Sequence, residues 1–166
     1  VEGDCHAFSA KSVVLATGGI TRCWSVCSGS WEYTGDGHAL ALWAGAELRD
    51  MEFVQFHPTG MVWPPSVRGI LVTEGVRGEG GRLTNSDGTR FMFDYVPEMF
   101  AGDHADSIEE SDQWVEEVVS GKLATVRRPP ELLTRDVVAK AINSEVKAGR
   151  GSPHGGAFLD ISHRGE

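Results

Sequence analysis

The sequence predicts an α+β fold attached to part of a larger α/β domain, and three observations carry this prediction. The run Ser12 to Gly19, SVVLATGG, is apolar and β-branched and ends in glycines, which is typical of a strand buried on both faces. Residues 39–44 lack a polar face, and a helix that is apolar all round must be covered all round. A hairpin and a further helix follow within residues 69–150.

The apolar helix is expected within residues 34–46. Thr34 and Asp36 are residue types that cap helix N-termini, and Gly45 is typical of a helix end. About 60 residues cannot supply the layers that would cover both this helix and the buried strand. Since the sequence also starts without methionine, we expect the chain to be a fragment and residues 1–60 to be a partial domain.

A partial domain should leave unusual apolar side chains in solvent. Side chains that a larger domain buries stay exposed when their partners lie elsewhere in the sequence. We therefore expect exposure near Val14, Leu40 and Trp43, beside a compact second domain over residues 61–166.

A strand that ends at a histidine is expected at residues 52–56. The alternation EFVQF indicates a half-buried strand, and Pro58 cannot donate to a sheet ladder, so pairing should stop there. His57 would then lie at a strand end, where scaffolds commonly present chemistry. A lone histidine is more often structural, so a functional role for His57 needs support from the rest of the chain.

Residues 69–95 predict an apolar strand, a glycine-rich bend and a hairpin. The hairpin turn is expected at Ser86, Asp87 and Gly88, between LTN and TRF. An acidic insert near residues 101–128 follows, and we expect a solvated helix face or a mobile segment there. Its acids have no intervening Lys or Arg and are Asp103, Asp106, Glu109, Glu110, Asp112, Glu116 and Glu117.

The most regular helical pattern follows two prolines. Thr134 is the expected N-cap and Gly149 the expected stop. The apolar stripe of this helix consists of Val137, Val138, Ala141, Ile142 and Val146.

Composition excludes several classes of function. The formal net charge of -9 over 166 residues argues against nucleic acid as a partner, because phosphate binding needs a basic surface. No apolar run approaches membrane-spanning length, so we expect no direct membrane insertion. Cys5, Cys23 and Cys27 match no zinc template, which predicts reduced thiols and no metal site.

Five charged or polar positions gain meaning when they are considered together. Glu74 and Arg77 could be an ordinary surface pair, and Arg135 could cap a carboxylate. However, an arginine in the first turn of a helix opposes the helix dipole by about 0.3–1 kcal/mol unless an anion is present. Glycines on both sides of EGVRGEGG would also let backbone approach a ligand. A dicarboxylate between His57, Thr73 and Arg135 would satisfy both features.

Six motifs in order carry a family resemblance. LATGG, TGDG, DMEFVQFHPTG, LVTEGVRGEGG, NSDGTRFM and LTRDVVAKAI resemble the flavoprotein subunit of succinate dehydrogenase and fumarate reductase, from about Val13 to about Gly151. The resemblance implies an FAD-dependent oxidoreductase that interconverts succinate and fumarate and passes electrons through an iron-sulfur subunit to quinone. It also implies an α+β capping domain attached to a partial α/β FAD-binding domain.

The resemblance implies a role for each matching residue. The FAD site would be lined by Leu15, Ala16, Thr17, Gly18, Gly19, Thr34, Gly35 and Asp36. Substrate would contact His57, Thr73 and Glu74. Arg135 would exchange a proton with substrate carbon, assisted by a relay through Glu74 and Arg77. Residue types alone would instead nominate His57 or Glu74 as the base, because arginine stays protonated in proteins.

Departures from the family pattern keep two alternatives open. The G-x-G-x-x-G fingerprint for the FAD pyrophosphate is absent, as are a second substrate histidine and arginine and the histidine that commonly tethers FAD. We expect this chain alone to be inactive. The alternatives are an L-aspartate oxidase-like flavoprotein and an acidic binding module without redox activity. In the complete enzyme the resemblance implies membrane-anchor subunits and a peripheral position on the cytoplasmic side of the inner (cell) membrane.

Overall fold

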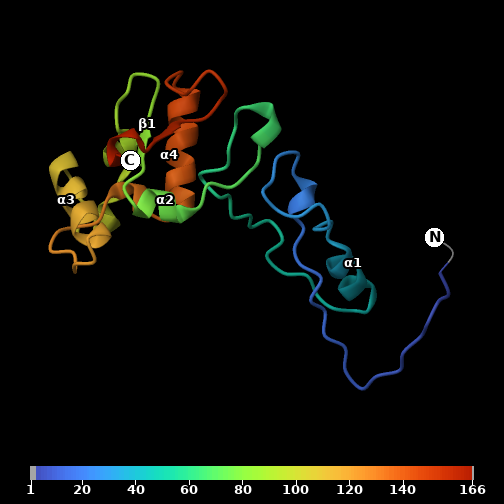
Figure 1. Ribbon diagram of the computed structural model, residues 1–166. Coiled ribbons are helices and arrows are strands. Elements are labelled where there is room, and N and C mark those ends of the chain that lie inside the picture. The colour runs from blue at the N-terminus through green and yellow to red at the C-terminus, as the bar shows by residue number, and fades with distance from the viewer. Residues whose placement is uncertain (1–2, 166) are drawn as a thin grey trace. The chain divides into compact units, whose positions relative to one another are not determined.

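The computed structural model describes residues 3–165, and the chain divides after Met51 into two compact units. The first unit contains α1 (Asp36–Trp43), and the second contains α2 (Glu74–Gly78), β1 (Arg82–Thr84), α3 (Ile108–Val119), α4 (Arg135–Lys147) and β2 (Phe158–Asp160) (Figure 1). Short 3-10 helices span Thr21–Cys23, Pro65–Val67, Phe91–Tyr95, Glu98–Phe100, Pro130–Leu132 and Ser162–Arg164.

Helix α1 begins and ends at glycines. Gly35 is the N-cap residue with a φ of 87°, and no side chain caps the helix. The expected capping by Thr34 is therefore wrong, because its hydroxyl instead donates a 2.5 Å hydrogen bond to the Asp36 carboxylate. The expected stop at Gly45 is confirmed by its φ of 93°, which the last turn needs so that the following amide can bond back into the helix.

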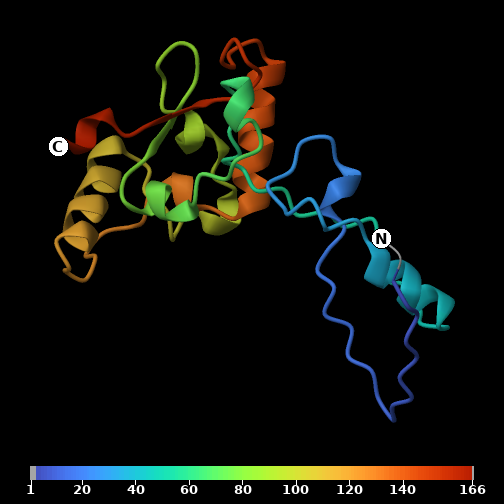
Figure 2. The same cartoon turned by 45° about the vertical axis from the view of Figure 1, so that its right-hand side comes forward.

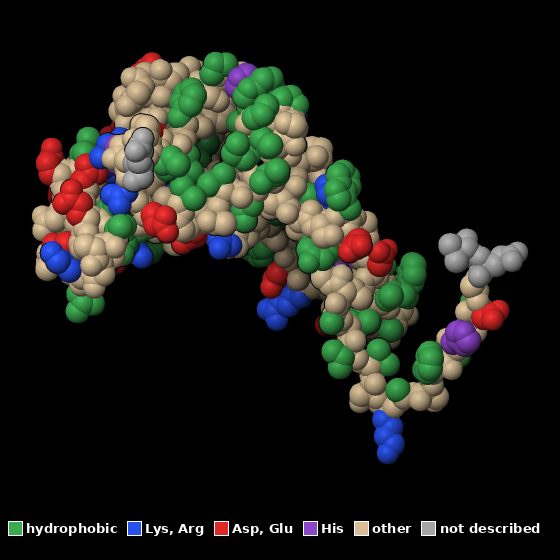
Figure 3. Space-filling view, in the orientation of Figure 1, with side chains coloured by type: hydrophobic (Ala, Val, Ile, Leu, Met, Phe, Trp, Pro, Cys, Tyr) green, Lys and Arg blue, Asp and Glu red, His purple; other side chains and the backbone are tan. Residues whose placement is uncertain are grey.

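The predicted buried strand at residues 12–19 is wrong. The structure has no strand there, and Val14 is 88% exposed. A strand needs a neighbour for its backbone groups, and no other described part of the chain pairs with this segment. The expected exposure is confirmed, since Leu40 is 50% and Trp43 80% exposed. Figure 3 shows hydrophobic side chains over the surface of the first unit.

The second unit opens with a segment that is not a strand, although a strand was predicted there. Residues 53–57 have no regular secondary structure, so the predicted strand at 52–56 is wrong. Pairing starts after Pro58 and not before it. The Met61 amide donates to the Ile70 carbonyl at 2.8 Å, and the Val72 amide donates to the Thr59 carbonyl at 2.9 Å. Proline lacks an amide hydrogen, so Pro58 cannot donate to a ladder, and these backbone hydrogen bonds begin beyond it.

The hairpin turn is confirmed and the glycine-rich bend is corrected. The Asn85 side-chain oxygen accepts the amides of Asp87 and Thr89 at 3.0 Å each, and Gly88 has a φ of 77°. Strand β1 pairs antiparallel with β2, with Leu83 opposite Leu159. The bend before β1 contains the short helix α2, which the flanking glycines obscured at the level of sequence.

Two helices complete the second unit around one core. The predicted helix and its stop are confirmed by α4 and by Gly149, which has a φ of 78°. Helices α3 and α4 lie on different sides of the unit in both views (Figures 1 and 2). The core is formed by Leu83, Phe91, Met92, Leu133, Val138 and Ala141.

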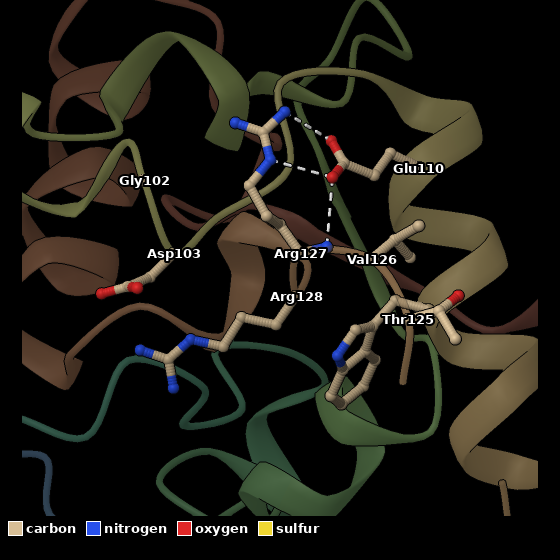
Figure 4. A pocket seen from close by; sticks show the side chains of 8 residues that line it. Gly102, Asp103, Glu110, Thr125, Val126, Arg127 and Arg128 are labelled. Carbon is tan, nitrogen blue, oxygen red and sulfur yellow. Dashed lines mark hydrogen bonds and ion pairs between the residues drawn. The ribbon is translucent and has the colours of Figure 1, made fainter. Parts of the chain in front are cut away.

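The acidic segment is an ordered helix whose carboxylates are partly paired. Ser107 caps α3 by accepting the Glu110 amide at 3.2 Å. Glu110 accepts two side-chain hydrogen bonds from Arg127 (Figure 4). Asp112 pairs with Arg82 and Arg90 at 2.7 and 3.2 Å. The expectation of a solvated face or a mobile insert missed these pairs, because their arginines are distant in sequence.

Candidate active site

The N-termini of α2 and α4 bring three charged residues together. Glu74 is the first residue of α2 and Arg77 lies one turn later, while Arg135 is the first residue of α4. One Glu74 carboxylate oxygen is 3.5 Å from Arg77 Nη2 and 3.6 Å from Arg135 Nε. A single carboxylate therefore lies between two guanidinium groups. The predicted proximity of Arg135 and Glu74 is confirmed, whereas the catalytic roles of these residues stay predictions.

Arg77 is a fully buried cation with few partners. Its side chain is 0% exposed, and Nη1 donates to the backbone carbonyl of Glu131. Nε and Nη2 are buried without a hydrogen-bond partner among the described residues. Burial lowers the pKa of Arg77, and the Arg135 charge adds to that effect, while Glu74 and Glu131 oppose it. The guanidinium of Arg77 therefore holds its proton less firmly than an exposed arginine does.

Arg135 and Glu74 form the open end of this arrangement. Their side chains are 45% and 52% exposed. Arg135 Nη1 also donates to Gln55 Oε1 at 3.1 Å. The sequence interpretation missed Gln55, although its spacing of two residues from His57 places both on one side of an extended segment.

The surroundings of His57 favour the neutral form of its ring. Its Nδ1 accepts the backbone amide of Thr59 at 3.3 Å, which assigns the ring proton to Nε2. Burial lowers the pKa of His57, and the charges of Arg135 and Arg77 lower it further, while Glu74 raises it. A neutral imidazole with a free N–H is suited to donating a hydrogen bond to a carboxylate. The charges of Arg77, Arg135 and Glu74 therefore all act on the His57 ring.

Thr73 lies directly beside this cluster. It is the N-cap residue of α2, but its side chain makes no capping bond and is exposed. Its hydroxyl is therefore open to a ligand. The structure brings His57, Glu74, Arg77 and Arg135 into mutual electrostatic contact and places Thr73 next to Glu74 in the chain.

The two motifs predicted to contact FAD pack against each other within the first unit. A Cβ at Gly18 would lie 2.6 Å from the Tyr33 ring, and a Cβ at Gly37 would overlap the Thr17 side chain. Gly18 also has a φ of 76°, which favours glycine. The residues from Leu15 to Gly18 are exposed. Small exposed residues on a tight loop fit close approach by a flat ring system, so the residues present fit this part of an FAD site.

Three further observations concern metal sites, membrane-spanning helices and a pocket beside α3. No group of three or more His, Cys, Asp or Glu side chains in residues 3–165 could hold a metal ion. Within the same residues, no helix is long and apolar enough to cross a membrane. The pocket beside α3 in Figure 4, lined by residues that include Glu110, Arg127 and Arg128, contains none of the predicted site residues.

Comparisons with known proteins agree with these features. The chain matches the family model "FAD binding domain" over residues 1–166 and belongs to that family. It is 47% identical over 157 residues to one chain of the fumarate reductase (CoM/CoB) of Methanothermobacter marburgensis, a match that covers 95% of this chain and 23% of that protein. It is 38% identical to the succinate dehydrogenase flavoprotein subunit of Rickettsia bellii, over 98% of this chain and 22% of that protein.

A solved structure supports the same assignment. "Mycobacterium smegmatis Sdh1 in complex with UQ1" matches with a TM-score of 0.59 and 58% identity, over 94% of this chain and 21% of that chain. Within the FAD-binding family, the chain is therefore a member of the succinate dehydrogenase and fumarate reductase flavoproteins. It spans less than a quarter of the length of these relatives.

Proposed function

We propose that the protein acts in an FAD-dependent oxidoreductase that interconverts succinate and fumarate. The observation that carries the proposal is the Glu74 carboxylate between Arg77 and Arg135, beside a neutral His57. This arrangement offers a proton path next to groups that bind a carboxylate. The membership of the chain in the flavoprotein family supports a redox role for the site.

Substrate binding follows from the charges of the site. The exposed Arg135 guanidinium can bind one carboxylate through two parallel hydrogen bonds. The Nε2–H group of His57 and the hydroxyl of Thr73 are further donors. A dicarboxylate satisfies these donors, whereas a cationic substrate would meet two guanidinium groups.

The reaction removes two hydrogens from adjacent carbons of succinate. One leaves with its bonding electrons, for which FAD is the acceptor when bound, and the other leaves as a proton. Arg135 is the group proposed to accept that proton, or to donate it when fumarate is reduced. Arginine is normally protonated, so it must first pass a proton to Glu74. Glu74 in turn is within ion-pair distance of Arg77, whose pKa burial lowers.

The flavin and the partner proteins complete the proposal. Residues from Leu15 to Gly19 and from Thr34 to Asp36 would contact FAD. Partners would be membrane-anchor subunits and an iron-sulfur subunit, which together pass electrons to quinone. Attachment through them would place the protein peripherally on the cytoplasmic side of the membrane.

The test is turnover by the holoenzyme, meaning the protein with FAD and the subunits it requires. We expect bound FAD by absorbance and succinate-dependent reduction of a soluble electron acceptor. Oxidation of L-aspartate in place of succinate would favour an L-aspartate oxidase-like enzyme. A holoenzyme preparation that holds no FAD would favour a binding module without redox activity.

A further inference from the structure

A buried carboxylate behind the relay has no role in the chemistry described so far. Glu131 lies in the 3-10 helix Pro130–Leu132 and its side chain is 0% exposed. Unpaired buried carboxylates are strongly disfavoured, so the partners of Glu131 indicate what it does. Its carboxylate accepts hydrogen bonds from the Arg90 side chain and, at 3.5 Å, from the Leu83 backbone amide, and its backbone carbonyl accepts one from Arg77.

The carboxylate of Glu131 is held by Arg90. Arg90 Nε donates to Glu131 Oε1 at 2.6 Å, and Nη2 donates to Oε2 at 3.0 Å. The arginine side chain is only 6% exposed, and its third nitrogen pairs with Asp112 of α3 at 3.2 Å. This two-point pair fixes the direction of the carboxylate as well as its position.

The backbone carbonyl of Glu131 holds Arg77. It accepts the hydrogen bond from Arg77 Nη1. The other two nitrogens of that guanidinium lack hydrogen-bond partners among the residues that the structure describes. The ion pair with Glu74 spans 3.5 Å to a carboxylate that is half exposed. The carbonyl of Glu131 is thus the principal anchor of the buried end of the relay.

We propose that Glu131 is a positioning residue for proton transfer: its carboxylate, clamped by Arg90, fixes the backbone carbonyl that holds Arg77 beside Glu74. The inference rests on the proposed relay through Arg77. It also gives α3 a function, because Asp112 orients Arg90 from that helix. The acidic segment is then connected to the site through side chains and not only through the chain.

The test compares two Glu→Gln substitutions in the holoenzyme, each of which replaces a carboxylate with an uncharged amide of similar shape. Glu131→Gln keeps the shape but turns an amide donor toward Arg90, so the carbonyl loses its support. A displacement of about 1 Å in a catalytic arrangement can lower rates about 100-fold, and we expect kcat to fall about 10- to 100-fold. The matched control is Glu110→Gln, which breaks a similar two-point pair with Arg127, at 2.9 and 2.8 Å, away from the relay. The control should leave kcat unchanged.

The affinity for a substrate analogue and a double substitution distinguish a positioning role of Glu131 from general damage to the structure. Affinity for malonate, a dicarboxylate that cannot lose two adjacent hydrogens, should change less than about twofold in Glu131→Gln, because the substrate contacts remain. In an Arg77→Lys background, Glu131→Gln should lower kcat less than about twofold further, since both act through one group. Equal effects of Glu131→Gln in both backgrounds would overturn the inference.

Two further outcomes are informative. If Arg77→Lys lowers kcat and Glu131→Gln does not, the positioning role is refuted while the relay stands. If Arg77→Lys leaves kcat unchanged, the relay itself is refuted, and the positioning role with it. Should Glu131→Gln fail to bind FAD, Arg90→Lys replaces it, because a single ammonium keeps the charge without the two-point clamp. Normal kcat in Arg90→Lys would then overturn the inference.

Discussion

The contacts of Glu145 on α4 predict how much this buried carboxylate contributes to the stability of the second unit. Its carboxylate accepts hydrogen bonds from Arg150 at 2.6 and 2.8 Å, from Tyr95 at 2.7 Å and from Asn85 at 2.9 Å. These bonds, with Arg150 first, lower the pKa of Glu145 from its usual 4.5 to about 2. That difference corresponds to about 3 kcal/mol at neutral pH. Because the Arg150 side chain is 45% exposed, solvent screening reduces the expected value to about 2 kcal/mol.

The folded protein favours the charged form of Glu145, and this sets the direction in which its contribution to stability changes with pH. The contribution is present above pH 4.5 and is lost as pH falls toward 2. Glu145→Gln should lower the free energy of unfolding by about 2 kcal/mol at pH 7 in urea denaturation, and by much less at pH 3. The control is Glu109→Gln, an exposed acid on α3. A loss below about 0.5 kcal/mol at pH 7, or a loss that is equal at both pH values, would refute the reasoning.

Two further predictions concern the substrate and flavin contacts. His57→Ala should raise KM for succinate with a smaller change in kcat, because it removes a carboxylate contact made before and during the reaction; unchanged KM in steady-state assays would contradict this. Gly37→Ala should lower the ratio of FAD to protein, measured by absorbance, because the new Cβ would overlap the Thr17 side chain in the predicted flavin loop; full FAD content would contradict it.

Local patterns predicted helices α1 and α4 but missed α2, and they predicted strands at residues 12–19 and 52–56 that do not form. The ends of α1 and α4 follow from Gly45 and Gly149, which need a positive φ. The apolar alternation at residues 52–56 could not reveal that the sheet found in the described residues consists of β1 and β2 and does not include this segment. A strand is defined by its partner, and a partner is not a local property of the sequence.

The candidate site was also predictable from the sequence only in part. Arg135 was recognisable because a basic residue opposes the dipole at a helix N-terminus. Its contact with Glu74 joins positions 61 residues apart, and only the family resemblance suggested it. Glu131 and Arg90 were missed, since nothing near them in sequence marks two charges as buried.

The proton-transfer role of Arg135 is the central claim, and Arg135→Lys tests it most directly. Lysine keeps a positive charge for carboxylate binding but loses the planar fork and the high proton affinity. The measurement is steady-state succinate oxidation by the holoenzyme with a soluble acceptor, at FAD content equal to that of the unmodified protein. We expect kcat to fall by several orders of magnitude with a comparatively small change in KM. Near-normal kcat would contradict the account and make Glu74 or His57 the better candidate for proton transfer.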